Sequence, residues 1–172
     1  AARANAAKNG YQGAQYPWES ADDGTEQCPD WTIEPDGTCY RCYVAVYEHH
    51  VTAAVAYGIY NYVKITHDIE FLLHKGAEIL VETARFWASR LQYVEEKDRY
   101  EIHQVTGPDE WHEPVDNNVY TNYLARWNLR YVIALAEMLK NEHPEEYKAL
   151  VEKVGLTEEE IAAWDAVQAK VY

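Results

Sequence analysis

Apolar residues recur at helical spacing through residues 49–91, and this pattern constrains the fold more than any other feature of the chain. From His49 to Thr66 the remaining faces are also small and apolar, and a helix that is apolar nearly all round is expected to be buried. From Asp68 to Leu91 charged residues flank one apolar stripe, which is typical of an amphipathic helix that faces outward. That stripe consists of Leu72, Gly76, Ile79, Thr83 and Phe86. The alternation predicts a mainly α fold with inner and outer helices.

Shorter patterns predict further helices and one hairpin. A first helix over residues 1–9 is expected to end at Gly10, because glycine tolerates the left-handed conformation that closes many helices. The turn sequence of residues 34–37 separates two alternating segments, 31–33 and 38–47, and predicts a small β-hairpin inserted among helices. Residues 100–105 form a short strand-like run. Three more helices are expected over residues 118–141, over residues 144–154, and from Thr157 onward, where Thr157 and Glu160 form a capping box.

One face of the helix predicted over residues 118–141 is rich in large apolar side chains, and this is the face expected to pack. It consists of Leu124, Trp127, Tyr131, Ala134 and Met138.

Charge excludes two classes of partner. The chain carries 15 Lys and Arg against 29 Asp and Glu, a net charge of −14, so phosphate backbones and anionic lipid surfaces would be repelled. We therefore expect no nucleic acid and no membrane as partners. No apolar run approaches the roughly 18 residues that a membrane span requires, and the default expectation is a cytoplasmic protein.

The three cysteines leave a metal-binding or structural module open as an alternative. An odd number argues against a disulfide framework. Cys39 and Cys42 have the spacing of a zinc-binding pair, and Cys28, His49 and His50 are available as further ligands. The chain lacks a second such pair, and in a regular strand Cys39 and Cys42 would point to opposite faces. We expect no metal.

The densest group of reactive side chains lies between the strand-like run and the next helix. Four carboxylates, those of Asp109, Glu110, Glu113 and Asp116, fall within eight positions beside Trp111. Mutual repulsion and partial burial would raise at least one pKa, and a carboxylic acid that stays protonated can donate to a leaving glycosidic oxygen. The same composition also suits a solvated acidic loop that caps the following helix through Asp116 or Asn117.

Four segments, in order, resemble glycoside hydrolase family 65, which contains kojibiose, nigerose, trehalose and maltose phosphorylases and the related acid trehalases. The first is Gly10-Tyr11-Gln12-Gly13-Ala14-Gln15-Tyr16-Pro17-Trp18-Glu19-Ser20, followed by Asp23-Gly24-Thr25-Glu26. The second is Glu48-His49-His50-Val51-Thr52-Ala53, and the third is Arg85-Phe86-Trp87. The fourth runs from Val105 through Gly107-Pro108-Asp109-Glu110 to Tyr120-Thr121-Asn122.

The resemblance implies part of an (α/α)6 barrel, a toroid of six helical hairpins whose pocket binds a terminal glucosyl unit. It places the general acid at Glu110, with Trp18, Glu19, Asp109 and Trp111 against the sugar. His50 would lie at the rim of the pocket by analogy, although a buried hydrogen-bonding role is the interpretation that we favour for it.

An inverting phosphorylase needs only one catalytic carboxylate, because phosphate is already an anionic nucleophile. The resemblance therefore implies phosphorolysis of an α-glucosyl disaccharide to β-glucose 1-phosphate and an acceptor sugar, with phosphate as co-substrate and no cofactor. Asp109, where maltose phosphorylases tend to carry Asn, favours a kojibiose-like or nigerose-like linkage. The alternative within the family is a hydrolase resembling acid trehalase, which would need a base; Glu26, Glu113 and Asp116 are candidates.

The chain is expected to be one part of a larger catalytic domain. It opens and closes within helical patterns, so we expect the complete domain to extend beyond both ends of residues 1–172. The family's phosphate-binding segments would then lie beyond Tyr172, and no glycine-rich phosphate loop or basic cluster appears before it. This segment alone would be inactive, and for the parent protein we consider a homodimer.

Overall fold

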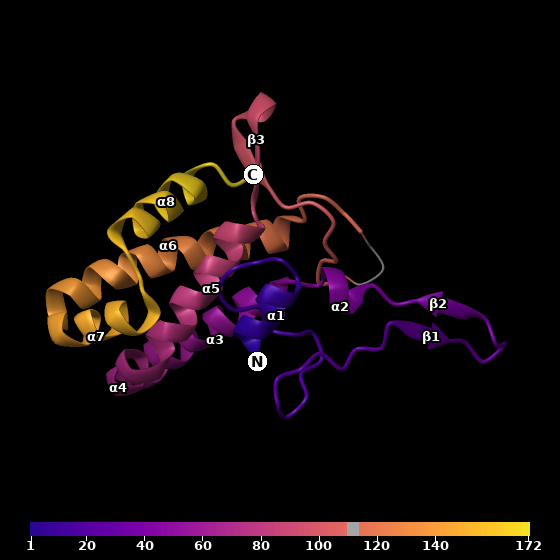
Figure 1. The fold of residues 1–172 in the computed structure, drawn as a ribbon, viewed down its shortest axis with the longest axis horizontal. Coiled ribbons are helices and arrows are strands. Elements are labelled where there is room, and N and C mark those ends of the chain that lie inside the picture. The colour runs from indigo at the N-terminus through magenta and orange to yellow at the C-terminus, as the bar shows by residue number, and fades with distance from the viewer. Residues whose placement is uncertain (110–113) are drawn as a thin grey trace.

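Three helices pack against one another and carry most of the core. The computed structural model describes residues 1–109 and 114–172. In it α5 packs most extensively on α6, and α3 contacts both. Figure 1 shows α7 and α8 folding back along α6, while the hairpin of β1 and β2 projects away from the helices. The helical segments are α1 (Ala2–Lys8), α2 (Val44–Tyr47), α3 (His50–Thr66), α4 (Ile69–Phe71), the π-helical turn η1 (Leu72–Gly76), α5 (Ala77–Arg90), the 3-10 turn η2 (Glu95–Lys97), α6 (Val119–Glu142), α7 (Pro144–Val154) and α8 (Glu158–Ala169).

The helix ends follow local chemistry, and the sequence predicted those at Gly10 and Thr157. Asp68 accepts a hydrogen bond from the Phe71 main chain at the start of α4, and Thr157 accepts one from the main chain of Glu160 at the start of α8. Gly10 adopts a φ of 80° just after α1. These caps satisfy main-chain groups that a helix end leaves unpaired. The mainly helical class is confirmed; closure of an (α/α)6 barrel stays a prediction.

The burial predicted for the two helices of residues 49–91 is wrong in both cases. α5, expected to face outward, is buried on most sides: its small residues allow close approach, and buried Glu82 is paired with Arg85 at 2.7 Å. α3, expected to be buried all round, leaves Tyr57, Tyr62 and Ile65 exposed, because neighbouring helices cover only one of its faces. The periodicity of apolar residues predicts which face of a helix is apolar, but it does not predict how many neighbouring elements pack against that helix.

The packing face of α6 is also rotated from the expected one. Leu124 of the expected face is buried, but Trp127, Tyr131 and Met138 are only partly buried. The centre of the helix face is formed instead by smaller apolar and polar residues that meet α5, α3 and α8. Its buried residues are Thr121, Asn122, Leu124, Ala125, Asn128, Leu129, Val132, Leu135, Ala136 and Leu139.

Two antiparallel hairpins interrupt the helices. The predicted hairpin pairs β1 (Trp31–Ile33) with β2 (Cys39–Arg41). Its second strand is shorter than expected, because the chain turns into α2 after Cys42 donates to the Asp30 carbonyl. A hairpin of β3 (Gln92–Val94) and β4 (Arg99–Glu101) was not predicted; only β4 overlaps the predicted strand-like run of residues 100–105, at residues 100 and 101.

Replacement of Leu80 tests the assignment of α5 to the core. Its side chain is completely buried, so Leu80→Ala in the intact protein should lower the free energy of unfolding by about 2–5 kcal/mol through lost burial and a residual cavity. Urea unfolding followed by tryptophan fluorescence measures the change. The control is Val119→Ala, at a position 81% exposed, where a change within about 0.5 kcal/mol is expected. Equal effects would contradict the assignment.

Candidate active site

The acidic loop is closed at its base by main-chain pairing. Val105 and Val115 form an antiparallel bridge with N–H···O distances of 2.9 Å in both directions. The Thr106 main chain also donates to the Tyr47 carbonyl at 3.0 Å, which ties the loop to α2. Asp109 is exposed. The predicted acid Glu110 and the predicted sugar contact Trp111 lie outside the described residues, as does Glu113.

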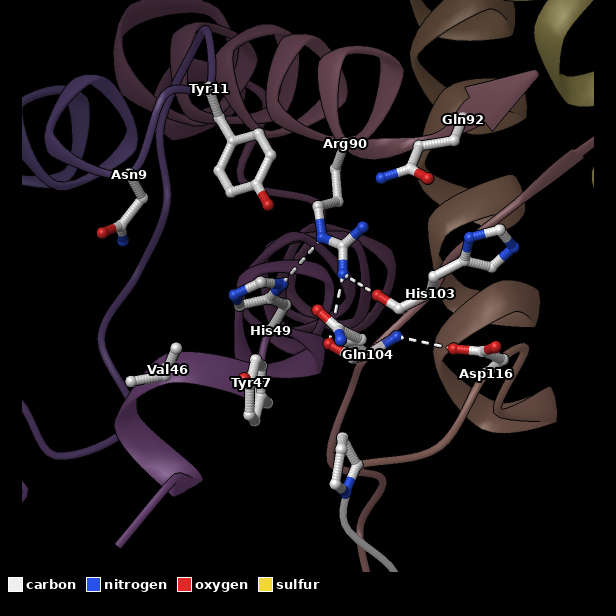
Figure 2. Close-up of a pocket in the computed structure, with 11 residues that line it drawn as sticks. Asn9, Tyr11, Val46, Tyr47, His49, Arg90, Gln92, His103, Gln104 and Asp116 are labelled. Carbon is white, nitrogen blue, oxygen red and sulfur yellow. Dashed lines mark hydrogen bonds between the residues drawn. The ribbon is translucent and has the colours of Figure 1, made fainter. Parts of the chain in front are cut away.

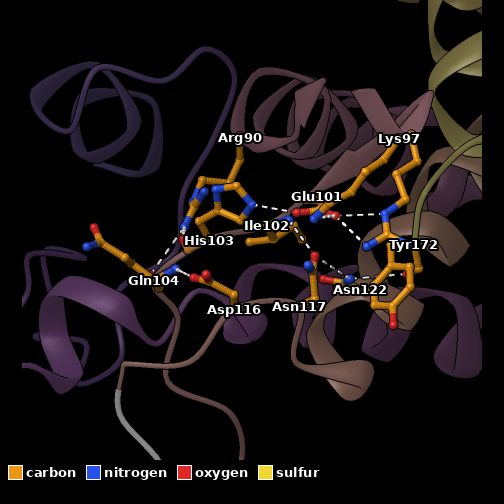
Figure 3. Close-up of polar contacts among 11 residues, drawn as sticks. Arg90, Lys97, Glu101, Ile102, His103, Gln104, Asp116, Asn117, Asn122 and Tyr172 are labelled. Atoms are coloured by element: carbon orange, nitrogen blue, oxygen red, sulfur yellow. Dashed lines mark hydrogen bonds and ion pairs between the residues drawn. The ribbon is translucent and has the colours of Figure 1, made fainter. Parts of the chain in front are cut away.

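Side chains fix the two chain segments that lead into this loop. Asp116 accepts the main-chain N–H of Gln104 at 2.9 Å, and Asn117 accepts that of Ile102 at 3.1 Å. The Asn117 main chain returns a bond to the Ile102 carbonyl at 2.7 Å (Figure 3). Gln104 and Asn117 adopt φ values of 53° and 54°, an uncommon conformation that neighbouring contacts must hold.

The loop that carries Trp18 and Glu19 is organised by Glu26. The Glu26 carboxylate accepts the main-chain N–H of Trp18 at 2.7 Å and that of Glu19 at 3.0 Å. It also accepts the N–H of Cys28 at 3.0 Å. The Trp18 side chain is half-buried and that of Glu19 is exposed. Both of the Glu26 oxygens are therefore occupied in shaping this loop.

His50 brings two of the predicted segments together. It lies in the first turn of α3, with its ring centroid 6.1 Å from that of Trp18 and 5.3 Å from that of Tyr120. The buried Glu48 carboxylate is 3.4 Å from the His50 Nε2 atom, and burial lowers the pKa of His50. The structure thus places Trp18 beside His50. His50 is thus buried among aromatic rings, and its role stays a prediction.

A cavity bounded by the described residues lies elsewhere, between the ends of α1, α2 and α5 and the stem of the acidic loop (Figure 2). Its volume is about 690 Å³, which is large enough for a small ligand. The predicted residues Trp18, Glu19, His50 and Asp109 do not line it. Its lining consists of Asn9, Tyr11, Val46, Tyr47, His49, Arg90, Gln92, His103, Gln104, Pro114 and Asp116.

Arg90 and His49 form a buried pair in the wall of this cavity. Arg90 donates from Nε to the Nδ1 atom of His49 at 3.1 Å, and from Nη2 to the carbonyls of His103 and Gln104, the latter at 3.3 Å. Burial, together with the Arg90 charge, lowers the pKa of His49 to about 3. His49 is therefore neutral near neutral pH, and its Nδ1 atom accepts a hydrogen bond from the guanidinium. Burial also lowers the pKa of Arg90.

The cysteines do not assemble a metal site in the described part of the chain. Cys28 and Cys42 approach with their sulfur atoms 3.7 Å apart, whereas Cys39 is exposed on β2. Over residues 1–109 and 114–172 no group of three or more His, Cys, Asp or Glu side chains could hold a metal ion. Over the same residues, no helix combines the length and the apolar character needed to cross a bilayer.

Comparison with known proteins identifies the family. The model of the glycosyl hydrolase family 65 central catalytic domain matches residues 1–172. The chain belongs to glycosyl hydrolase family 65. Kojibiose phosphorylases of Thermoanaerobacter brockii and of Caldanaerobacter subterraneus subsp. tengcongensis are 54% and 53% identical over 172 residues, which cover all of this chain and 22% of each relative. A solved structure assigned as a kojibiose phosphorylase from the human microbiome superimposes with a TM-score of 0.81 at 28% identity, covering 98% of this chain and 23% of that one.

Membership of family 65 makes the chain part of an enzyme, and it spans about a fifth of the length of these relatives. The sequence motifs had pointed to Trp18, His50 and the acidic loop but not to Arg90. A signal for Arg90 was present: the stripe of residues 72, 76, 79, 83 and 86 continues at position 90 with the same spacing. A charged residue that continues an apolar stripe is expected to be buried, and a buried charge needs hydrogen-bonding partners. This expectation would have made Arg90 a candidate site residue.

A glycine replacement tests the packing of the acidic loop against the start of α6. A Cβ atom at Gly107 would lie 2.3 Å from the Nδ2 atom of Asn118, whose side chain caps α6 by accepting the Thr121 N–H. Gly107→Ala in the intact protein should therefore cost about 1 kcal/mol of unfolding free energy through the displaced cap. Gly58→Ala is the control, because no atom lies within 4 Å and alanine favours a helix; it should be neutral or stabilising. Equal effects in urea unfolding would contradict this packing.

The neutral state of His49 predicts a pH dependence. Its folded pKa of about 3 lies below the ordinary value of 6.5, so the unfolded chain takes up the proton first. This residue's contribution to stability should fall as pH drops from about 6.5 towards 3, by at most about 1.4 kcal/mol per pH unit. His49→Gln removes the titration, so the stability gap between wild type and variant should narrow from about pH 7 to about pH 5. Urea unfolding at both values measures the gap; a constant gap would exclude a neutral buried His49.

Proposed function

We propose that the chain forms part of the (α/α)6-barrel catalytic domain of a disaccharide phosphorylase with kojibiose-like specificity. The observation that carries the proposal is the identity of 53–54% with two kojibiose phosphorylases over all 172 residues. Identity falls to 40% for an α,α-trehalose phosphorylase and to 42% for a kojibiose hydrolase. The sequence also favoured a nigerose-like linkage, but none of the relatives named above is a nigerose phosphorylase.

In this proposal Glu110 is the general acid. It protonates the oxygen between the two sugars while phosphate attacks C1 of the glucosyl unit from the opposite face, so that an α-glucoside gives β-glucose 1-phosphate and a free acceptor sugar. Trp18 supplies a ring face for stacking and Glu19 an acceptor for sugar hydroxyls. The proximity of Trp18 to His50 supports a shared sugar-binding surface. Asp109 and Trp111 flank the acid in sequence and remain proposed sugar contacts.

The second candidate is hydrolysis, which the kojibiose hydrolase relative favours. A hydrolase needs a carboxylate base with an oxygen free to activate water. Glu26 uses both of its oxygens on main-chain N–H groups, and Asp116 uses one on Gln104. Of the three predicted bases, Glu26 therefore fails this requirement, which weighs against its acting as the base. The cytoplasmic location and the homodimeric parent stay predictions.

Replacement of the proposed acid tests the mechanism. In the intact protein Glu110→Gln should lower kcat on kojibiose about 10²–10⁴-fold, because the amide cannot donate the proton that the leaving group needs. The control, Glu159→Gln at an exposed site on α8, should leave kcat unchanged. Consumption of kojibiose and release of glucose 1-phosphate are both measured, with and without phosphate. Full activity of Glu110→Gln would exclude this residue as the acid, and turnover that ignores phosphate would establish the hydrolase.

A further inference from the structure

We propose that Arg90 is a positioning residue for the general acid: its guanidinium group fixes the stem of the loop that carries Glu110. The inference rests on the proposed function, because it gives Arg90 a role in phosphorolysis through Glu110. Arg90 ends α5, and Val105 and Val115 close the loop that contains Glu110. The contacts between them run through residues 103 and 104.

Arg90 is an unusual buried charge because its acceptors are uncharged. Its side chain belongs to a residue only 3% exposed, and it donates to an imidazole nitrogen and two main-chain carbonyls. A buried cation is costly unless it is well compensated. A second arginine of the same helix, Arg85, has two carboxylate partners, Glu82 and Glu160. The buried guanidinium group of Arg90 is therefore better explained by the main-chain geometry that it fixes than by a net contribution to the stability of the fold.

The geometry that Arg90 holds is the turn at Gln104. Arg90 Nη2 reaches the carbonyls of two consecutive residues, His103 and Gln104, and Gln104 adopts a φ of 53°. The N–H of Gln104 is held from the other side by Asp116, as Figures 2 and 3 show. Both main-chain groups of this left-handed residue are thus fixed by side chains, and the next residue is Val105, where the loop begins.

We call the hydrogen bonds of Arg90 to His49, His103 and Gln104 the Arg90 clamp. Neighbouring contacts hold this clamp in place. His49 is packed edge-on against Tyr11 and Phe86, with ring centroids 5.9 Å and 5.7 Å apart. On the other side, the buried Glu101 accepts hydrogen bonds from His103 at 2.7 Å and Arg99 at 2.7 Å. These bonds, with one from Lys97, hold the pKa of Glu101 well below its usual range. A lysine at position 90 would keep the charge but lose the fork that reaches several acceptors at once.

Fixing the stem matters because proton transfer needs close approach. A general acid acts within about 2.6–3.2 Å of the oxygen that it protonates, and a displacement of about 1 Å can reduce the rate about 100-fold. A loop stem released at Gln104 would let the acid sample positions outside that range. The loss should then be confined to the step that needs the proton.

The test compares substrates that differ in their need for the acid. Kojibiose has a poor leaving group, whereas α-glucosyl fluoride loses fluoride without protonation by the enzyme. In the intact protein Arg90→Met should lower kcat on kojibiose about 100-fold and on the fluoride only a few-fold, the same selectivity as Glu110→Gln. Arg85→Met removes a buried charge from the same helix, away from the loop, and should affect both substrates equally. Equal loss on both substrates in Arg90→Met would overturn the proposal.

A readout that needs no activity separates this proposal from the proposed function. Hydrogen exchange of the peptides covering residues 102–117 should accelerate in Arg90→Met and not in Arg85→Met. If Arg90→Met fails to fold, Arg90→Lys is measured instead, with the same expected pattern. If hydrogen exchange of these peptides is unchanged in the folded Arg90 variant, the proposal that Arg90 fixes the loop stem is wrong. If wild type turns over neither substrate, the proposed function fails, and the positioning role fails with it even where the exchange data support the clamp.

Discussion

The packing of α5 against α6 is the contact on which the rest of this chain depends. Phe86 and Trp87 are completely buried in the face of α5, and small residues such as Ala84 let the neighbouring helices approach closely. The helix that a sequence pattern assigns to the outside is therefore the centre of the described core. Its charged residues are accommodated because Glu82 pairs with Arg85 and Arg3 rather than with water. The end of this rigid helix carries Arg90 to the loop.

The position of the acidic loop relative to α5 is fixed by side chains that hydrogen-bond to the main chain of the loop stem. Residues 101–104 and 115–117 lie side by side, but only Val105 and Val115 pair as strands do. Asp116, Asn117 and Arg90 supply the bonds that a regular ladder would otherwise make. This arrangement allows left-handed turns at Gln104 and Asn117, which a regular ladder would exclude, and it fixes where the loop leaves the fold.

The family assignment and the geometry bear on different parts of the proposed reaction. Membership of family 65 limits the chemistry to that of an enzyme family with phosphorylases and a hydrolase among its members. The geometry adds that Glu26 is engaged on the Trp18 loop through both oxygens, so this carboxylate shapes that loop and is a poor candidate for the base that a hydrolase would need. The proposed phosphorolysis needs no base, because phosphate already carries the negative charge that a water molecule would need a base to acquire.

The sequence by itself determined what depends on neighbouring residues along the chain. Thr157 caps α8, Gly10 closes α1 and the turn of residues 34–37 joins two strands, because caps and turns are made by a few consecutive residues. The motifs likewise indicated the family and the residues Trp18 and His50. Only the tertiary structure decided that α5 is central and that Arg90 meets His49, 41 positions away in sequence. Those outcomes depend on which helices pack against each face, and an apolar stripe in the sequence does not specify which other helix covers it.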